Sequence, residues 1–364
     1  MNVLYLYPEE WTGRRAREIH TLHTAAAMAQ AGLDVTIATG GGLEMESALR
    51  QIEAPASQRL TNCNFWRVFS LGKLKIRSHV LYRWQLERWW RGKERHFDLG
   101  FAIHLKAAAW FRQKRIPYVW EAHEIFSETA PGLVESERLA VRGARIRIAT
   151  SHALAEGLRK RFGGDLVFTV VPNAGQPPEH EEYWHPEGPI LYAGGLEVWK
   201  GLDVALAAAL ALGKRVRLVG GTEKEKAQLL TRLPYPERHG WIEWQPYQGA
   251  RELLRYFKGV SVGIIPTRLD TPSGYYSCPM KLFDYARCGI PVVASALPAL
   301  ESLEIEGWLF RVFDNKVEGW RAALGREHRG GAEIKAWAAR HTWQRRGERL
   351  AEVLRGGRDS SAGE

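Results

Sequence analysis

The sequence predicts an α/β protein built from two doubly wound, parallel-sheet domains. At 364 residues the chain is too long for one average domain and fits two of about 170 to 180 residues each. A strand, a helix and a second strand follow one another at 2–39, and the same pattern restarts after residue 188. The segment between the halves, 175–188, is rich in Pro, Glu and His, and we expect it to be the linker.

Composition and charge narrow the class of protein. Apolar residues make up 45% of the chain and charged residues 25%, which is typical of soluble domains. The net charge of +10 favours an anionic partner such as a nucleotide or an acidic membrane surface. Three cysteines are too few and too scattered for a disulfide framework or a zinc site. No signal-peptide pattern and no apolar run of about 18 residues is present. We therefore expect a cytoplasmic protein that contacts at most the inner face of the membrane.

The first βαβ unit begins with a strand at 2–7 and a loop at 8–13. A helix follows at 14–31, with Ile19, Leu22, Ala26 and Ala29 on one side, and a second strand lies at 33–39. After Gly13, three cations oppose the dipole of this helix, namely Arg14, Arg15 and Arg17. A bound anion would offset that repulsion, and a solvated basic helix start is the alternative.

A basic and aromatic run occupies 65–98. Its members are Trp66, Arg67, Lys73, Lys75, Arg77, Tyr82, Arg83, Trp84, Arg88, Trp89, Trp90, Arg91, Lys93 and Arg95. Tryptophans beside cations suit the headgroup zone of an anionic membrane. The alternative is a helix with a packed Trp face and a solvated Arg face. Nucleic acid is the least favoured partner, and we expect none.

The rest of the first half continues the alternation of strands and helices. Strands are expected at 97–103, 118–121 and 140–151, and helices at 106–114 and 152–161. His123 comes directly after the second of these strands. The carboxyl end of a parallel strand faces the ligand site in sheets of this type, so His123 is a candidate site residue. A purely structural histidine is the alternative.

The second half shows the same order of elements. Strands are expected at 189–194, 215–220, 241–245 and 260–266, with helices at 202–212 and 249–257. From about residue 333 two helical pieces carry Trp337 and Trp343, and 356–364 has the composition of a disordered tail. The His and Glu residues of the linker have no spacing typical of metal ligands, so no metal site is expected.

The most informative stretch runs from Tyr275 to Ser295. A small polar loop leads into a helix at 281–287, and Gly289 and Pro291 precede a short buried strand. Unpaired N–H groups at the start of a helix suit an anion such as a diphosphate. Lys281 adds charge there, and Asp284 lies about one turn further on, where it can accept from a sugar hydroxyl. The alternative is a plain core helix and strand.

This stretch resembles the donor-binding signature of GT-B glycosyltransferases, most closely the family 4-like glycosyl transferases of group 1. That signature has a Glu, seven residues, a second Glu and a Gly-x-Pro-Val-Val-Ala-Ser ending. Asp284 takes the second acidic position and Gly289 to Ser295 match the ending, whereas Tyr276 stands at the first acidic position. The resemblance extends to Lys200, but Gly195 stands where the family has an Arg.

The resemblance implies two Rossmann-like domains that face a cleft. It divides the chain into an acceptor domain at 1–174, the linker at 175–188 and a donor domain at 189–340. A helix at 341–355 returns to the first domain, and the tail at 356–364 follows. It also implies a retaining transfer from a UDP- or GDP-linked sugar, without metal or cofactor, in polysaccharide biosynthesis. The acceptor would be a glycan or a lipid-linked glycan.

The resemblance also assigns roles to residues. The catalytic group would be His123 near the sugar, with Lys200 and Lys281 on the diphosphate. The donor-binding residues would be Gly13, Gly194, Gly195, Lys200, Tyr247, Tyr276, Ser277, Cys278, Pro279, Met280, Lys281, Leu282 and Asp284. The arginines Arg14, Arg15 and Arg17 would serve the acceptor or the phosphate. Because Tyr276 and Gly195 depart from the pattern, a degenerate GT-B protein that binds without turnover is the main alternative. An epimerase of related fold would need paired carboxylates, which this chain lacks. A phosphorylase would usually need a much longer chain.

Overall fold

The chain forms two compact units. A computed structural model describes residues 1–66, 68–71, 74–77, 79–305 and 307–356. Unit 1 comprises Met1–Pro172 together with the C-terminal segment from Trp343, and unit 2 comprises Asn173–Thr342. Arg67 and Lys73 of the basic run, and residues 357–364 of the expected tail, lie outside the described residues.

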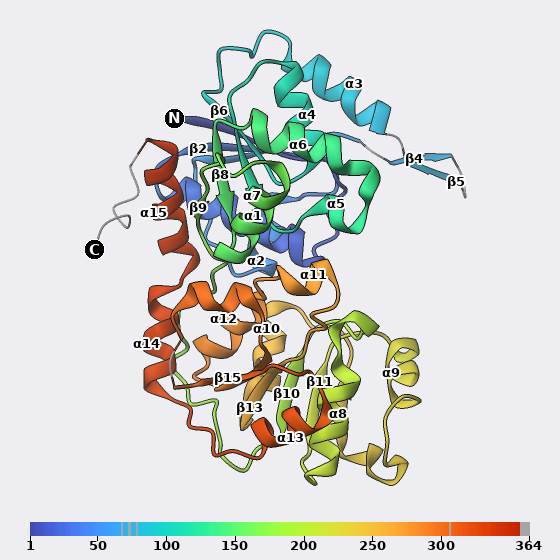
Figure 1. Ribbon diagram of the computed structural model, residues 1–364. Coiled ribbons are helices and arrows are strands. Elements are labelled where there is room, and N and C mark those ends of the chain that lie inside the picture. Colours follow the sequence, from blue (N-terminus) through green and yellow to red (C-terminus); the bar gives the residue numbers. More distant parts are fainter. Residues whose placement is uncertain (67, 72–73, 78, 306, 357–364) are drawn as a thin grey trace. The chain divides into compact units, whose positions relative to one another are not determined.

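Unit 1 is built on a parallel sheet with the strand order β3-β2-β1-β6-β7-β8-β9 (Figure 1). Its strands are β1 (Asn2–Tyr7), β2 (Asp34–Thr39), β3 (Leu60–Asn64), β6 (Leu99–Ala102), β7 (Tyr118–Ala122), β8 (Ile146–Ala149) and β9 (Thr169–Val170). Alternate residues of β1 point to opposite faces. Val3 and Tyr5 pack in the main core of this unit, while Leu6 faces Trp110 on the other side. Both faces are therefore covered, which explains the unbroken apolar run of β1.

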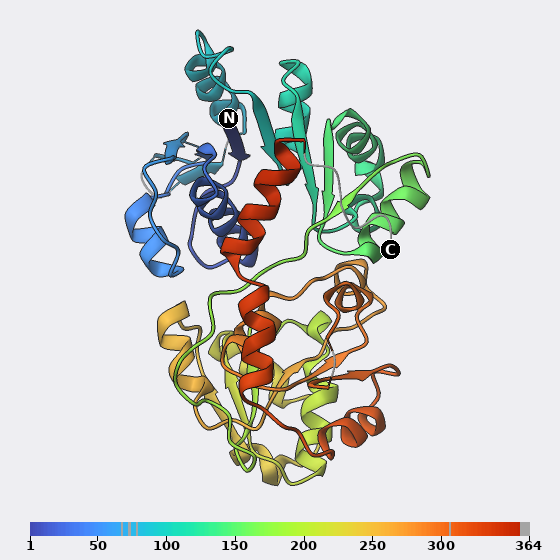
Figure 2. The ribbon, with the colours of Figure 1, turned by 90° about the vertical axis from the view of Figure 1, so that its left-hand side faces the viewer.

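The helices of unit 1 fill the crossovers between strands. They are α1 (Ala16–Gln30), α2 (Met45–Gln51), α3 (His79–Trp90), α4 (Leu105–Gln113), α5 (Phe126–Thr129), α6 (Val134–Gly143), α7 (His152–Phe162) and α15 (Trp343–Leu354), with a 3₁₀ turn, η1, at Pro131–Leu133. An antiparallel hairpin, β4 (Val68–Leu71) and β5 (Leu74–Arg77), precedes α3. The final helix α15 runs beside α1 (Figure 2), and its Leu350 joins the core that α1 and β1 form.

Unit 2 repeats the design with a second parallel sheet, ordered β12-β11-β10-β13-β14-β15. The strands are β10 (Ile190–Ala193), β11 (Val216–Val219), β12 (Ile242–Gln245), β13 (Val262–Ile265), β14 (Val292–Ser295) and β15 (Leu309–Val312). Ile190 packs in a core with α8 and α13, whereas Leu191 packs in a second core with α12 and α14. In each unit the strand order reverses beside the first strand, at β1/β6 and at β10/β13. Such a switch point is where parallel α/β sheets bind ligands.

The helices of unit 2 are short and follow the strands in order. They are α8 (Leu202–Ala211), α9 (Glu223–Leu230), α10 (Ala250–Leu253), α11 (Pro272–Tyr275), α12 (Met280–Arg287), α13 (Val317–Leu324) and α14 (Ala332–Arg340). The 3₁₀ turns are η2 (Val198–Lys200), η3 (Pro236–Trp241), η4 (Leu254–Phe257) and η5 (Pro298–Leu303). The segment expected to be the linker packs on this unit, because Tyr183 is buried and Trp184 Nε1 donates to the Ser261 carbonyl over 2.9 Å.

The structure corrects two expectations about local structure. Residues 140–143 end helix α6 rather than starting a strand, since Ala140 and Val141 face the core at helical spacing; the strand begins at Ile146. Strand β3 lacked a sequence signal because Leu60–Asn64 is mostly polar and lies at the sheet edge. Among the described residues no helix combines the length and apolar character needed to cross a bilayer.

Candidate functional site

The loop after β10 forms the centre of a candidate site in unit 2. Gly194 N donates to the Val219 carbonyl over 2.8 Å, so the loop leaves the carboxyl edge of the sheet next to β11. Gly194 has φ of +153°, and a Cβ placed on it would lie 2.5 Å from Lys281 Nζ. Glycine therefore suits the backbone conformation here, and an added Cβ would displace the lysine ammonium.

Helix α12 brings Lys281 to this loop. Tyr285, one turn further along the helix, accepts from Ala193 N over 3.0 Å and so fixes α12 against the end of β10. Lys281 Nζ lies 4.2 Å from the centre of the Tyr192 ring, whose hydroxyl donates to the Gly195 carbonyl over 2.5 Å. The ammonium is thus held at the start of α12, where the first backbone N–H groups of the helix have no acceptor within the helix.

The electrostatics of this place favour an anion. Burial and, next, the neighbouring Lys200 ammonium lower the pKa of Lys281 to about 7, while Glu197 and Asp284 act in the opposite direction. Burial also lowers the pKa of Lys200, whose Nζ lies 3.6 Å from the centre of the Trp199 ring. Glu197 acts on both lysines and Asp284 on Lys281, but burial outweighs them and the pKa of each lysine stays below its ordinary value. An anion that entered would supply the missing charge.

The loop before α12 is held from within the same unit. Asn173 Nδ2 donates to the Cys278 carbonyl over 2.6 Å, and Cys278 is buried. The rings of Tyr275 and Tyr276 meet edge to face, 5.0 Å apart. Ser277, Pro279 and Met280 complete the loop, and Leu282 is buried under it.

Two further expected donor residues belong to unit 2. Asp284 is half-buried on α12 and acts on the charge of Lys281. Tyr247 is exposed beyond the end of β12, two strands away from β10 in the sheet. The structure therefore brings Gly194, Gly195, Lys200 and Lys281 together, with Asp284 beside them and Tyr247 farther along the same edge.

The first loop of unit 1 differs from the expected anion site. Glu18 is fully buried and its carboxylate accepts from Thr12 Oγ1 over 2.8 Å and from Arg14 N over 3.2 Å. Arg15 pairs with Glu9 and Glu18, and Arg17 pairs with Glu124. The carboxylate of Glu18 already offsets the cations at the start of α1, so an anion is not needed for that purpose. Gly13 is buried and accepts from Gln51 Nε2 through its carbonyl over 3.1 Å.

His123 lies in a buried polar cluster that the sequence did not reveal. His123 Nε2 is 3.5 Å from Glu121 Oε1, and His20 Nε2 is 3.7 Å from the same oxygen. Arg346 on α15 donates to Glu121 and, over 3.0 Å, to Thr24 Oγ1. Burial opposes ionisation of Glu121, yet Arg346 and the two imidazoles lower its pKa. The carboxylate is therefore charged, and it lies beside His123 at the carboxyl end of β7.

A hollow of about 660 Å³ lies at the carboxyl ends of β1, β2 and β3. Its walls combine two indoles with carboxyl, amide and hydroxyl groups, from Glu10, Trp11, Thr12, Glu44, Ser47, Gln51, Asn64 and Trp66. Indoles together with several hydrogen-bonding groups suit a polar ring such as a sugar. No sequence motif marks this hollow, because its walls come from three separate loops.

Comparisons with known proteins agree with this architecture. Residues 17–174 match the family model of the glycosyl transferase 4-like domain, and residues 187–326 match that of glycosyl transferases group 1. Together the two models cover most of the chain. No curated protein matches the sequence.

Solved structures share the fold over nearly the whole chain. HepE from Anabaena, in complex with UDP and glucose, has 16% identity and a TM-score of 0.70 over 97% of this chain and 99% of that one. Sucrose-phosphate synthase from Thermosynechococcus elongatus has 15% identity and a TM-score of 0.69 over 97% and 94%. The lipopolysaccharide outer core galactosyltransferase WaaB, in its apo form, has 15% identity and a TM-score of 0.68 over 97% and 99%.

The predicted fold class is confirmed by these matches: each unit is a Rossmann-like parallel sheet wrapped by helices. The two family models follow one another in the order that the sequence motifs predicted. The chain therefore belongs to the glycosyl transferases of group 1 with a 4-like first domain, and it is a glycosyltransferase of the GT-B fold.

Proposed function

We propose that the protein transfers a sugar from a nucleotide-sugar donor, UDP- or GDP-linked, to a glycan or lipid-linked acceptor. The observation that carries the proposal is the pair of desolvated ammonium groups, Lys281 and Lys200, at the start of α12. A diphosphate has the charge and the oxygen atoms to interact with both lysines and with the positive end of the α12 dipole. HepE, of similar fold, was solved with UDP.

The donor residues then divide by chemistry. Lys200, Lys281 and the backbone of Gly194 and Gly195 would stabilise the negative charge that grows on the leaving diphosphate. Asp284 would accept hydrogen bonds from ribose hydroxyls. The other expected donor contacts are Gly13, Tyr247, Tyr276, Ser277, Cys278, Pro279, Met280 and Leu282. Because two ammonium groups supply the positive charge, the transfer needs no metal ion, cofactor or Asp-x-Asp motif.

His123 would lie beside the reacting carbon of the donor sugar. The ionised Glu121, which Arg346 pairs with, lies 3.5 Å from His123 Nε2, and the dipole of the ring would support the oxocarbenium-like transition state. We propose that the transfer retains the anomeric configuration, as the family resemblance implies. The anomeric proton coupling of the product, measured by NMR, decides this: inversion would refute it.

The hollow at the ends of β1, β2 and β3 would receive the acceptor. The exposed Trp66 would stack on a sugar ring, and Glu10 and Glu44 would accept from its hydroxyls. Arg14, whose side chain is exposed, and the ion-paired Arg15 and Arg17 lie on the adjoining loop and would meet a phosphate on a lipid-linked acceptor.

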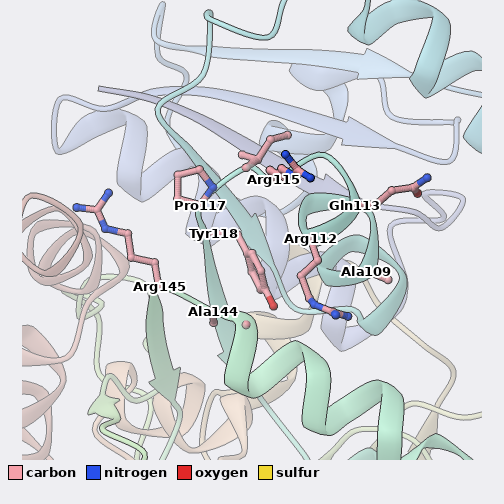
Figure 3. A pocket seen from close by; sticks show the side chains of 10 residues that line it. Ala109, Arg112, Gln113, Arg115, Pro117, Tyr118, Ala144 and Arg145 are labelled. Carbon is pink, nitrogen blue, oxygen red and sulfur yellow. The ribbon is translucent and has the colours of Figure 1, made fainter.

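We also propose that unit 1 contacts an anionic membrane. In the basic run, Tyr82, Leu86 and Trp90 are buried, but Trp66 and Trp84 are 71% and 57% exposed. Arg83 Nη2 donates to Gln113 over 2.5 Å, which connects α3 with a shallow hollow of about 690 Å³. Figure 3 shows the side chains that line it, among them Arg112, Arg115 and Arg145. Exposed indoles and arginines suit phosphate headgroups, and a cytoplasmic enzyme of polysaccharide biosynthesis would meet them at the inner membrane face.

A donor screen tests the central proposal. We expect one of the UDP-, GDP-, ADP- or dTDP-linked sugars to raise the melting temperature and to release nucleoside diphosphate slowly, with excess EDTA present. Lys281→Met and Gly194→Ala should each lower the release rate about 100-fold, since they remove or displace charge from the leaving group.

The controls for the screen lie in the same unit. Lys224→Met removes an exposed lysine, and Gly249→Ala adds a methyl to open space, so both should behave as wild type. Binding without release, even with acceptors present, would favour the degenerate GT-B protein to which Tyr276 and Gly195 point. A failure of every donor to bind would refute the site.

The lowered pKa of Lys281 predicts how binding depends on pH. Near pH 7 and above, the free protein loses the charge of Lys281, whereas a bound diphosphate favours the charged form. UDP affinity should therefore fall by up to about tenfold per unit between pH 7.5 and 9, with uptake of about one proton. Calorimetry in buffers of different ionisation enthalpy measures this uptake. Lys281→Arg stays charged and should show neither effect; an equal pH dependence in this variant would contradict the account.

The acceptor hollow can be tested by filling it. Ser47→Trp places a large ring in the hollow, so transfer to an acceptor should fall at least about tenfold while donor hydrolysis stays the same. Glu46→Trp, on the same helix but outside the hollow, is the control. The ratio of transfer to hydrolysis is the measurement. Equal effects of both variants, or none, would mean that the acceptor binds elsewhere.

Membrane contact can be measured by sedimentation with vesicles. Binding to vesicles that contain phosphatidylglycerol should exceed binding to neutral phosphatidylcholine vesicles and should fall with salt. Changing Arg112, Arg115 and Arg145 to Glu should weaken it roughly tenfold or more. The paired control changes the exposed Arg251 and Arg326 of unit 2 to Glu. If the control weakens binding as much, net charge rather than this surface is responsible.

A further inference from the structure

The cluster around His123 holds three potential metal ligands. His20 comes from α1, Glu121 from β7, and His123 from the loop that follows β7. One ligand atom of each residue lies within 4.8 Å of one ligand atom of each of the others. The rings of His20 and His123 are 4.3 Å apart, centre to centre, at an angle of 82°. Two imidazoles and one carboxylate are a ligand set that borderline transition metals prefer.

The hydrogen bonding of the cluster is incomplete. His20 is 3% exposed and Glu121 is 0% exposed. Both ring nitrogens of His20, Glu121 Oε2 and His123 Nε2 are buried and have no hydrogen-bond partner among the described residues. Burying so many polar atoms without partners destabilises a fold, and a water molecule or an ion between them would relieve that cost.

Arg346 leaves one carboxylate oxygen available. Its guanidinium donates to Glu121 Oε1, to Thr24 Oγ1 and to the Pro172 carbonyl. Oε2 keeps its lone pairs, and the pairing keeps Glu121 ionised in a buried place. The same guanidinium offsets part of the negative charge of Glu121. A bound cation would therefore depend mainly on the two imidazole nitrogens, and the site suits an ion that binds nitrogen ligands strongly. Mg²⁺ and Ca²⁺ need more oxygen ligands than the cluster provides.

We propose that His20, Glu121 and His123 bind one divalent transition-metal ion of the Zn²⁺ class. A water molecule or a substrate oxygen would complete the four-coordinate shell. The consequence for activity rests on the proposed function: since His123 meets the donor sugar there, a bound ion would withdraw it. Zn²⁺ is then an inhibitor of a transfer that itself needs no metal.

The test is a metal titration of the untagged, full-length protein. Co²⁺ is the probe, because its visible absorption reports four-coordinate nitrogen and oxygen ligation, and Zn²⁺ should displace it at one ion per chain. His20→Asn and Glu121→Gln should each weaken Co²⁺ binding at least tenfold. His23→Asn is the matched control: it lies one turn along α1, is buried and stacks on Trp343, but is not one of the three ligands.

Thermal melting confirms that each variant is folded. Glu121→Gln leaves Arg346 without its charge partner, so if that variant unfolds, His20→Asn and His123→Asn carry the test. The absence of saturable one-to-one binding, or equal binding in His20→Asn, overturns the metal site. Zn²⁺ should also lower the transfer rate, and EDTA should restore it. In His20→Asn, Zn²⁺ should lower the rate by a smaller factor, measured against the metal-free rate of that variant. If the metal binds but the transfer rate does not change, the metal site stands, and the proposal that His123 lies beside the donor sugar is wrong.

Discussion

The candidate site depends on the half-buried ammonium of Lys281, which lies beside an aromatic ring and a second lysine. Lys281 reaches the backbone of Gly194 because no side chain stands there, and the Tyr192 ring supports it from one side. Burial and Lys200 lower its pKa to about 7. A cation in such a place is unfavourable by itself, and an anion removes the penalty. The site is therefore prepared for a ligand with negative charge before any ligand arrives.

The two units position their candidate site residues in the same way. In unit 2, Tyr285 fixes α12 to the end of β10, so the start of the helix meets the loop at the switch point of the sheet. In unit 1, α15 returns from the end of the chain and places Arg346 on Glu121, beside which His20 and His123 lie. Both arrangements use buried polar contacts between elements that are far apart in sequence. Parallel sheets allow this because every strand presents its carboxyl end at one edge.

The sequence predicted the features that local patterns encode. The βαβ units, the loop at Gly194 and the helix that carries Lys281 follow from apolar periodicity and from Gly and Pro positions. The two-unit GT-B architecture followed from motifs in order. The strand predicted from Ala140 was wrong at its start, where α6 ends. Ala140 and Val141 suit either a strand or a helix, and packing against the sheet decides between them.

The parts of the site that the sequence missed depend on tertiary contacts. Arg346 and Glu121 are separated by 225 positions, and no motif connects them. His20 lies in the middle of an ordinary amphipathic pattern, where a buried histidine has no distinct signal. Glu18 was hidden for a related reason: its carboxylate turns back onto the helix start, so the arginines after Gly13 have partners that the charge pattern did not show.

The most direct test of the account is a crystal structure of the protein with a nucleoside diphosphate. The account predicts that diphosphate oxygens lie within hydrogen-bond distance of Lys281 Nζ, Lys200 Nζ and the N–H groups of Gly194 or Gly195. A diphosphate bound elsewhere, with Lys281 still against the Tyr192 ring and without an anion, would contradict the central claim. In that case the buried lysine would serve the stability of unit 2 and not the transfer.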